Sequence, residues 1–189
     1  HAQFRRQRQM CIRDSSYVDK DANPKIAKQV ILNAKLRNTA ICGATETVIL
    51  HEKIIKKFGL SILENLEKHG CKIIADNKIR KIYNGKIKKA TRQDWSKEYL
   101  DPTVSVKSVK NLDEAILHIN KYGTMHTDCI ITQNKKSANK FLKYVKSSIA
   151  MHNTSTQFAD GGEFGFGAEI GISTNNLPPR GPVGLNQLV

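Results

Sequence analysis

The chain has 189 residues, of which 39% are hydrophobic and 25% charged, a balance that excludes a disordered chain and is typical of a soluble globular domain. No run of about 18 apolar residues occurs, so we expect no membrane-spanning helix. No apolar stretch follows the first arginines, so we do not expect them to form a secretory signal. The formal net charge is +14. Because single lysines in helical patterns supply most of it, we expect solvated helix faces and no nucleic-acid partner, whose site would interleave arginine with aromatic residues.

The first 15 residues share no periodicity with the rest of the chain. Within them, RQRQMCIRDS resembles translated sequencing-adapter read-through. We therefore expect residues 1–15 to lie outside the fold, to be disordered and to pack against nothing. The first strand is expected to start near Ser16 and Tyr17.

Strands and helices alternate from there to residue 152. Asn23 and Pro24 are typical of a helix start, and the apolar positions that follow them repeat at helical spacing. Further helices are predicted from about residue 54 to Gly70, over 111–122 and over 135–146. Strands are predicted over 47–51, 71–75, 103–109, 127–132 and 148–152. This alternation predicts an α/β fold with a largely parallel, open sheet.

From residue 153 the composition changes. Five glycines between positions 161 and 171 and three prolines between 178 and 182 predict loop and extended chain. Such a backbone can approach a ligand or another strand closely. The glycines are spaced GxGxxxG and not GxGxxG, which argues against a dinucleotide-binding loop.

Cys42 is the candidate nucleophile among four cysteines. It lies in TAICGATET, before a short predicted helical turn, and a helix N-terminus lowers the pKa of a thiol and offers N–H groups to an oxyanion. The alternative, a small buried hydrophobic residue, is favoured by spacing alone. Cys71 and Cys129 lie inside strand patterns and are expected to be buried. His126 and His152 are expected to be hydrogen-bonded structural residues, and no histidines or cysteines have the spacing of a metal site.

Four stretches, read in order, resemble the signatures of the γ-glutamyl phosphate reductase family. They are NAKLRNTAICGATET, DWSKEYLDPTVSVK, INKYGTMHTDCIIT, and MHNTSTQFADGGEFGFGAEIGIST followed by RGPVGL. The family belongs to the aldehyde dehydrogenase superfamily, so the resemblance implies a catalytic domain over 16–152 with helices on both faces of its sheet. It implies a glycine-rich active-site loop and C-terminal segment over 153–189, which returns toward an N-terminal and oligomerisation region.

The resemblance also implies a function. The family reduces L-glutamyl 5-phosphate to L-glutamate 5-semialdehyde with NADPH, through a cysteine thioester, in proline synthesis in the cytoplasm. Cys42 falls on the catalytic cysteine, and Glu98 on the glutamate that hydrogen-bonds the nicotinamide ribose. The residues that match the substrate pocket are Asn153, Ser155, Thr156, Gly161, Gly162 and Phe164, with Arg180 as an anion partner. No metal ion is implied.

The resemblance further implies a C-terminal fragment that lacks most of the NADPH site and is inactive alone, taken from a full-length homo-oligomer. The same stretch forms the C-terminal part of bifunctional pyrroline-5-carboxylate synthases, which is one alternative. A basic nucleic-acid-binding α/β module and a non-catalytic structural domain are others. The order of the motifs disfavours the nucleic-acid module, and the intact Cys42 and Glu98 disfavour the non-catalytic domain.

Overall fold

The computed structural model describes residues 11–163, 165, 173 and 174. Its strands are β1 (Asp14–Val18), β2 (Thr45–His51), β3 (Lys72–Ala75), β4 (Ile87–Lys89), β5 (Thr103–Val109), β6 (Thr127–Ile131) and β7 (Ile149–His152). Its helices are α1 (Pro24–Leu36), α2 (Glu52–Ile54), α3 (Leu60–Lys68), α4 (Asn77–Arg80), α5 (Leu112–Tyr122) and α6 (Lys135–Tyr144). A π-helical turn, η1 (Ile55–Gly59), joins α2 to α3, and η2 (Asp94–Ser96) and η3 (Thr156–Phe158) are 3₁₀ turns.

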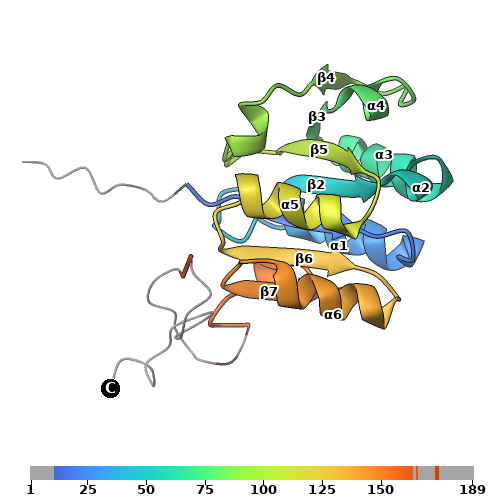
Figure 1. Ribbon diagram of the computed structural model, residues 1–189. Helices are drawn as coiled ribbons and strands as arrows, with labels where there is room; N and C mark the ends of the chain where they lie inside the picture. The colour runs from blue at the N-terminus through green and yellow to red at the C-terminus, as the bar shows by residue number, and fades with distance from the viewer. Residues whose placement is uncertain (1–10, 164, 166–172, 175–189) are drawn as a thin grey trace, which may run out of the picture.

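The strands form one parallel sheet in the order β4-β3-β5-β2-β1-β6-β7, and helices cover both of its faces (Figure 1). Helices α5 and α6 lie on one face, and α1 and α3 on the other. Because successive strand residues point to opposite faces, β2 places Val48 and Leu50 in the core beneath α1 and α3, and Ile49 in the core beneath α5 and α6. The predicted α/β class with a parallel sheet is confirmed.

Local sequence signals set the helix boundaries. The Asn23 side chain accepts hydrogen bonds from the backbone N–H groups of Lys25 and Ile26 and so caps α1. Asn111 caps α5 in the same way, by accepting from the N–H of Glu114. After α3, Gly70 adopts φ +81°, a left-handed conformation that suits glycine. These starts and ends agree with those predicted from the sequence.

The prediction that residues 1–15 pack against nothing is wrong for residues 12–15. Strand β1 begins at Asp14, earlier than predicted, and Ile12, Asp14 and Ser15 are buried. The physical reason is that β1 lies between β2 and β6, so residues that extend it find partners on both sides. Residues 1–10 lie outside the described part of the chain.

The predicted glycine-rich segment falls mostly outside the described residues, which break off at 163 apart from three later positions. Four short elements, α4, β4, η2 and η3, were not predicted. None of the described helices is long and apolar enough to cross a membrane.

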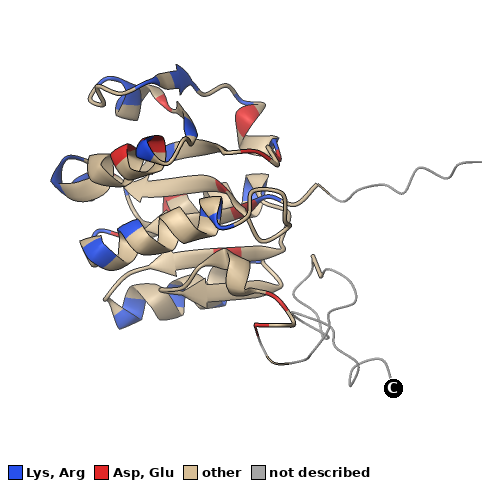
Figure 2. Cartoon of the chain, turned by 180° about the vertical axis from the view of Figure 1, so that it is seen from behind, with Lys and Arg blue, Asp and Glu red and all other residues tan. Residues whose placement is uncertain are grey.

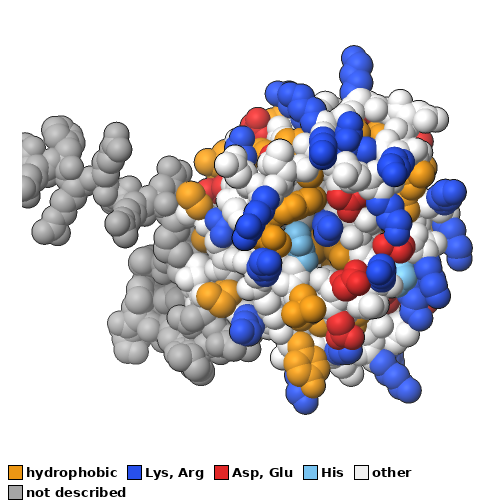
Figure 3. Space-filling view, turned by 45° about the horizontal axis from the view of Figure 1, so that its top comes forward, with side chains coloured by type: hydrophobic (Ala, Val, Ile, Leu, Met, Phe, Trp, Pro, Cys, Tyr) orange, Lys and Arg blue, Asp and Glu red, His pale blue; other side chains and the backbone are white. Residues whose placement is uncertain are grey.

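Basic side chains are spread over the surface. From behind, Lys and Arg residues lie on several helices and on the edge strand β4 (Figure 2). On the face in Figure 3, acidic and hydrophobic side chains lie between the basic ones. The charge is therefore distributed over these faces and not gathered on one element.

Candidate active site

Loops that lead into neighbouring strands meet at one edge of the sheet. Cys42 precedes β2, Glu98 precedes β5 and His126 precedes β6. In a parallel sheet the amino ends of all strands lie at the same edge, so residues far apart in the sequence come together there. Electrostatic interactions reflect this proximity: Cys42 contributes to the raised pKa of His126, and Glu98 to the raised pKa of Asp14.

Cys42 lies in a turn and not at a helix N-terminus. The N–H of Ala44 donates to the carbonyl of Ile41 at 3.1 Å, and β2 begins directly afterwards at Thr45. The predicted helical turn after Cys42 is therefore wrong, because residues 45–51 continue the strand, which their β-branched side chains favour. The Cys42 side chain is half-buried, which distinguishes it from a buried filler.

His126 is the neighbour of Cys42 that sequence reasoning missed. It is buried, and its Nδ1 lies 3.0 Å from both carboxylate oxygens of Asp14. Burial lowers the pKa of His126, but the Asp14 carboxylate outweighs burial and, with smaller contributions from Cys42, raises it well above its usual range. The imidazole is therefore cationic at neutral pH, beside a cysteine.

Both histidines named from the sequence are hydrogen-bonded, as predicted: His126 to Asp14, and His152 through Nε2 to the carbonyl of Thr132 at 2.8 Å. The available signal for His126 was its position just before a predicted strand, which it shares with Cys42. Asp14 belongs to the stretch that resembles adapter read-through, so we base no function on it.

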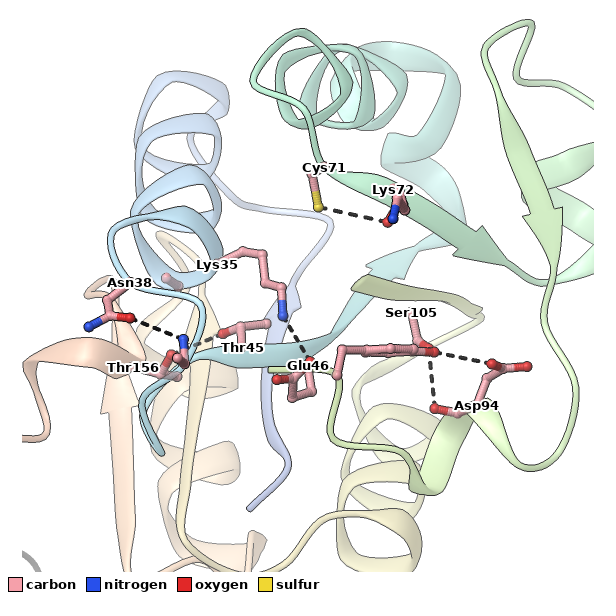
Figure 4. A network of polar contacts seen from close by, with 12 residues as sticks. Lys35, Asn38, Thr45, Glu46, Cys71, Lys72, Asp94, Ser105 and Thr156 are labelled. Carbon is pink, nitrogen blue, oxygen red and sulfur yellow. Dashed lines mark hydrogen bonds and ion pairs between the residues drawn. The ribbon is translucent and has the colours of Figure 1, made fainter. Parts of the chain in front are cut away.

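The Cys42 loop is held on one side by η3. Thr45 Oγ1 lies 2.9 Å from Thr156 Oγ1, and Figure 4 shows these two side chains together. A Cβ atom on Gly43 would lie 3.1 Å from the Gln157 Cα and from the Thr156 carbonyl oxygen, closer than most Cβ contacts. Glycine beside Cys42 therefore permits the close approach of η3.

Gln157 joins η3 to the end of α1 and to the start of the loop that carries Cys42. Its Nε2 donates to the carbonyls of Ala34 at 2.9 Å and Asn38 at 3.1 Å, and its Oε1 accepts from the N–H of Asn38 at 3.1 Å. The Gln157 side chain and its bond to Ala34 are buried, and its two bonds to Asn38 are partly buried. Gln157 thus fixes the end of α1 and the start of the Cys42 loop.

The predicted substrate residues that the structure describes divide into three groups. Ser155 and Thr156 are buried beside β2 and near Gly43. Asn153 lies apart, at the carboxyl end of the sheet, where its amide bonds the backbone N–H and carbonyl of Thr132. Beyond η3, Gly161 is buried, and Gly162 is exposed and donates its N–H to Asp160. Phe164 and Arg180 lie outside the described residues.

Cys71 and Cys129 are buried, as predicted. Burial raises the pKa of each thiol to about 12, so both stay protonated at neutral pH. Among the described residues, no group of three or more His, Cys, Asp or Glu side chains could hold a metal ion.

The sequence is similar to curated γ-glutamyl phosphate reductases. It is 48% identical over 172 residues to the enzyme of Bartonella tribocorum, covering 91% of this chain and 42% of the relative. The enzyme of Clostridium beijerinckii is 47% identical over 91% of this chain and 41% of its own length. The chain thus spans about two fifths of the length of these relatives. No family model matches the sequence.

Solved structures give the same result. The crystal structure of γ-glutamyl phosphate reductase from Thermotoga maritima superposes with a TM-score of 0.89 at 46% identity, over 94% of this chain and 42% of that one. An engineered glycolyl-CoA reductase with bound NADP+ superposes at 0.64 and 20% identity, over 91% of this chain and 47% of that one. The second similarity is one of fold alone, and it is the fold of aldehyde-dehydrogenase-like enzymes.

Proposed function

Over the segment it shares with its relatives, the chain belongs to the γ-glutamyl phosphate reductase family, and we propose that it forms the catalytic-cysteine part of an enzyme that reduces L-glutamyl 5-phosphate to L-glutamate 5-semialdehyde with NADPH. The observation that carries this proposal is the half-buried Cys42 thiol in the loop before β2, at the amino edge of the sheet. Cys71 and Cys129, by contrast, are buried and protonated at neutral pH.

Cys42 acts as the nucleophile. Its thiolate attacks the acyl carbonyl of the substrate, the bond to the phosphate oxygen breaks, and a thioester on Cys42 and free phosphate result. The thiolate is released again when the aldehyde leaves. A thiolate suits both stages because it is a good nucleophile and a good leaving group.

Glu98 fits a role in holding the nicotinamide cofactor. Its half-buried carboxylate lies in the loop before β5, at the same edge of the sheet as Cys42. An ionised carboxylate accepts hydrogen bonds only, which matches a ribose with two hydroxyl donors. When bound, NADPH supplies the hydride, and Glu98 fixes the sugar next to it.

For the rest of the substrate site, Ser155 and Thr156 border the pocket beside β2, and Gly161, Gly162, Phe164 and Arg180 complete the set of substrate-binding residues. Asn153 acts by shaping the chain reversal after β7, since its amide is used by Thr132. The working enzyme is a cytoplasmic homo-oligomer of proline synthesis, and this chain alone is inactive.

A chimaera tests the proposal: the chain replaces the matching segment of the Bartonella tribocorum enzyme, and phosphate-dependent oxidation of glutamate 5-semialdehyde by NADP+ is followed. Cys42→Ala is expected to lower kcat/KM by roughly a thousandfold or more, because the covalent route is lost. Cys129→Ala is the matched control, which should lower stability but preserve turnover per folded molecule. Near-normal turnover by Cys42→Ala would refute the assignment.

A further inference from the structure

A buried ion pair closes the loop that carries Cys42. Lys35 in the last turn of α1 places its Nζ 2.8 Å from Oε2 of Glu46 in β2, and the two side chains are 0% and 2% exposed. Figure 4 shows the side chains pointing toward one another. Because Cys42 lies between them in the sequence, the pair connects the two ends of its loop.

Stability alone does not account for this pair. Removing two charges from water costs several kcal/mol for each ion, roughly as much as their attraction returns. Burial raises the pKa of Glu46, and Lys35 opposes that rise. Lys35 therefore favours the charged form of Glu46, which burial disfavours.

The Glu46 carboxylate also faces the turn that carries Glu98. The backbone N–H groups of Tyr99 and Leu100 lower the pKa of Glu46. The buried Oε1 of Glu46 has no hydrogen-bond partner among the described residues, so we take the effect of these N–H groups to be electrostatic. Lys35 reaches the same turn, with its Nζ 5.9 Å from the centroid of the Tyr99 ring.

The backbone of this turn needs support. Leu100 adopts φ +55°, in the left-handed region that leucine rarely occupies. Such a conformation persists only where surrounding groups hold it. The Tyr99 hydroxyl bonds Ser105 Oγ at 2.8 Å, which ties the far end of its ring to β5, and Glu46 faces the backbone itself.

We propose that Lys35 and Glu46 are positioning residues that hold the Cys42 loop and the Glu98–Leu100 turn in a fixed relation. The Glu46 carboxylate faces the amides of the turn, and the ion pair with Lys35 holds it in that place. Neither side chain contacts reacting atoms. This inference rests on the proposed roles of Cys42 and Glu98, because it gives the reason why the thiol and the cofactor glutamate must stay in register.

The test compares single and double variants. Glu46→Gln or Lys35→Met alone leaves one buried charge unpaired and is expected to lower the thermal midpoint of the 189-residue chain. The double variant Lys35→Met, Glu46→Gln removes both charges at similar volume, so much of that stability should return. A purely structural pair predicts that the double variant then behaves as the parent does.

If Lys35 and Glu46 position the turn, the double variant should differ from the parent. Hydrogen exchange of the Tyr99 and Leu100 amides in the 189-residue chain should be about tenfold faster than in the parent, because the turn opens more often. In the chimaera, KM for NADPH should rise about tenfold and kcat should fall, because the cofactor glutamate is misplaced relative to the thiol. Parental exchange and parental kinetics in a stable double variant would overturn the proposal.

Two controls separate the possible failures. The exposed ion pair between Lys140 of α6 and Asp113 of α5 lies far from the Cys42 loop in the sequence, and Lys140→Met with Asp113→Asn should leave exchange and kinetics unchanged. Glu98→Gln should also raise KM for NADPH. If it does not, the proposed role of Glu98 fails, whereas faster exchange at Tyr99 and Leu100 in the double variant would still support the positioning of the turn.

Discussion

The surroundings of Cys42 differ from those of Cys71 and Cys129. Cys71 Sγ lies 3.7 Å from the carbonyl oxygen of Lys72, and Cys129 Sγ lies 3.0 Å from that of Thr154, so each thiol has a backbone acceptor in a buried site. At pH 7, a thiol of pKa about 12 is almost never ionised, and only the thiolate reacts with an alkylating reagent. Cys42 is half-buried, and its neighbour is His126.

Alkylation should therefore follow these surroundings. With iodoacetamide at pH 7, we expect Cys42 to be modified at least about a hundredfold faster than Cys71 and Cys129, as peptide mass spectrometry would measure. Cys11, which is exposed, is an internal reference for reagent quality. Cys42 labelling as slow as that of Cys71 would contradict the expectation.

At the scale of elements, the contact between η3 and the end of α1 fixes the Cys42 loop. Gln157 alone supplies three hydrogen bonds across it, two to backbone carbonyls and one from a backbone N–H. Truncating this side chain leaves buried polar groups without partners, which costs more than the bonds themselves contribute.

Gln157→Ala is expected to lower the free energy of unfolding by about 1–3 kcal/mol, because the buried carbonyl of Ala34 loses its partner. Urea denaturation of the 189-residue chain measures this change. Gln29→Ala, on the exposed side of α1, is the matched control and should stay within about 0.5 kcal/mol of the parent. Equal effects of the two substitutions would mean that the Gln157 side chain does not stabilise the contact between η3 and α1.

Elements with strong local signals could be predicted, and contacts between distant elements could not. Strand β5 lies at its predicted bounds, and α5 begins one residue after the predicted start at residue 111, because periodicity is read from neighbouring residues. The short α4 and β4 have too few residues for a period to show. The meeting of Cys42 with His126 depends on β6 lying beside β1 across the sheet, and no local pattern encodes that strand order.

At the scale of the whole molecule, the parallel sheet buries ionisable groups near its centre. Asp128 of β6 is 1% exposed, accepts a hydrogen bond from the N–H of Ser15 at 2.7 Å, and is also bonded by the Ser147 hydroxyl. Burial, and then the charge of Asp14, raise the pKa of Asp128 to about 8. The folded protein therefore keeps a proton on Asp128 at neutral pH that the unfolded chain, with an ordinary carboxyl pKa of 3.8, has already released.

Stability should consequently fall as pH rises through the neutral range. A folded-state pKa above the unfolded value contributes stability that is complete at low pH and is lost as pH approaches the folded pKa. Asp128 and His126 both act in this direction, because the pKa of each is raised. The buried His51 and His118 act in the opposite direction, but only below pH 6.5, their unperturbed value.

Between pH 6.5 and 8, therefore, the pH dependence of stability comes from Asp128 and His126, whose pKa values are raised. Between these limits the free energy of unfolding, measured in urea, should decrease by about 3 kcal/mol, since each of the two protons contributes up to about 1.4 kcal/mol per pH unit. Asp128→Asn should flatten the dependence by the share of one proton, because an amide does not titrate. His118→Asn should leave the slope in this window unchanged. A stability that rises from pH 6.5 to 8 in the parent would show that neither Asp128 nor His126 has a raised pKa in the folded protein.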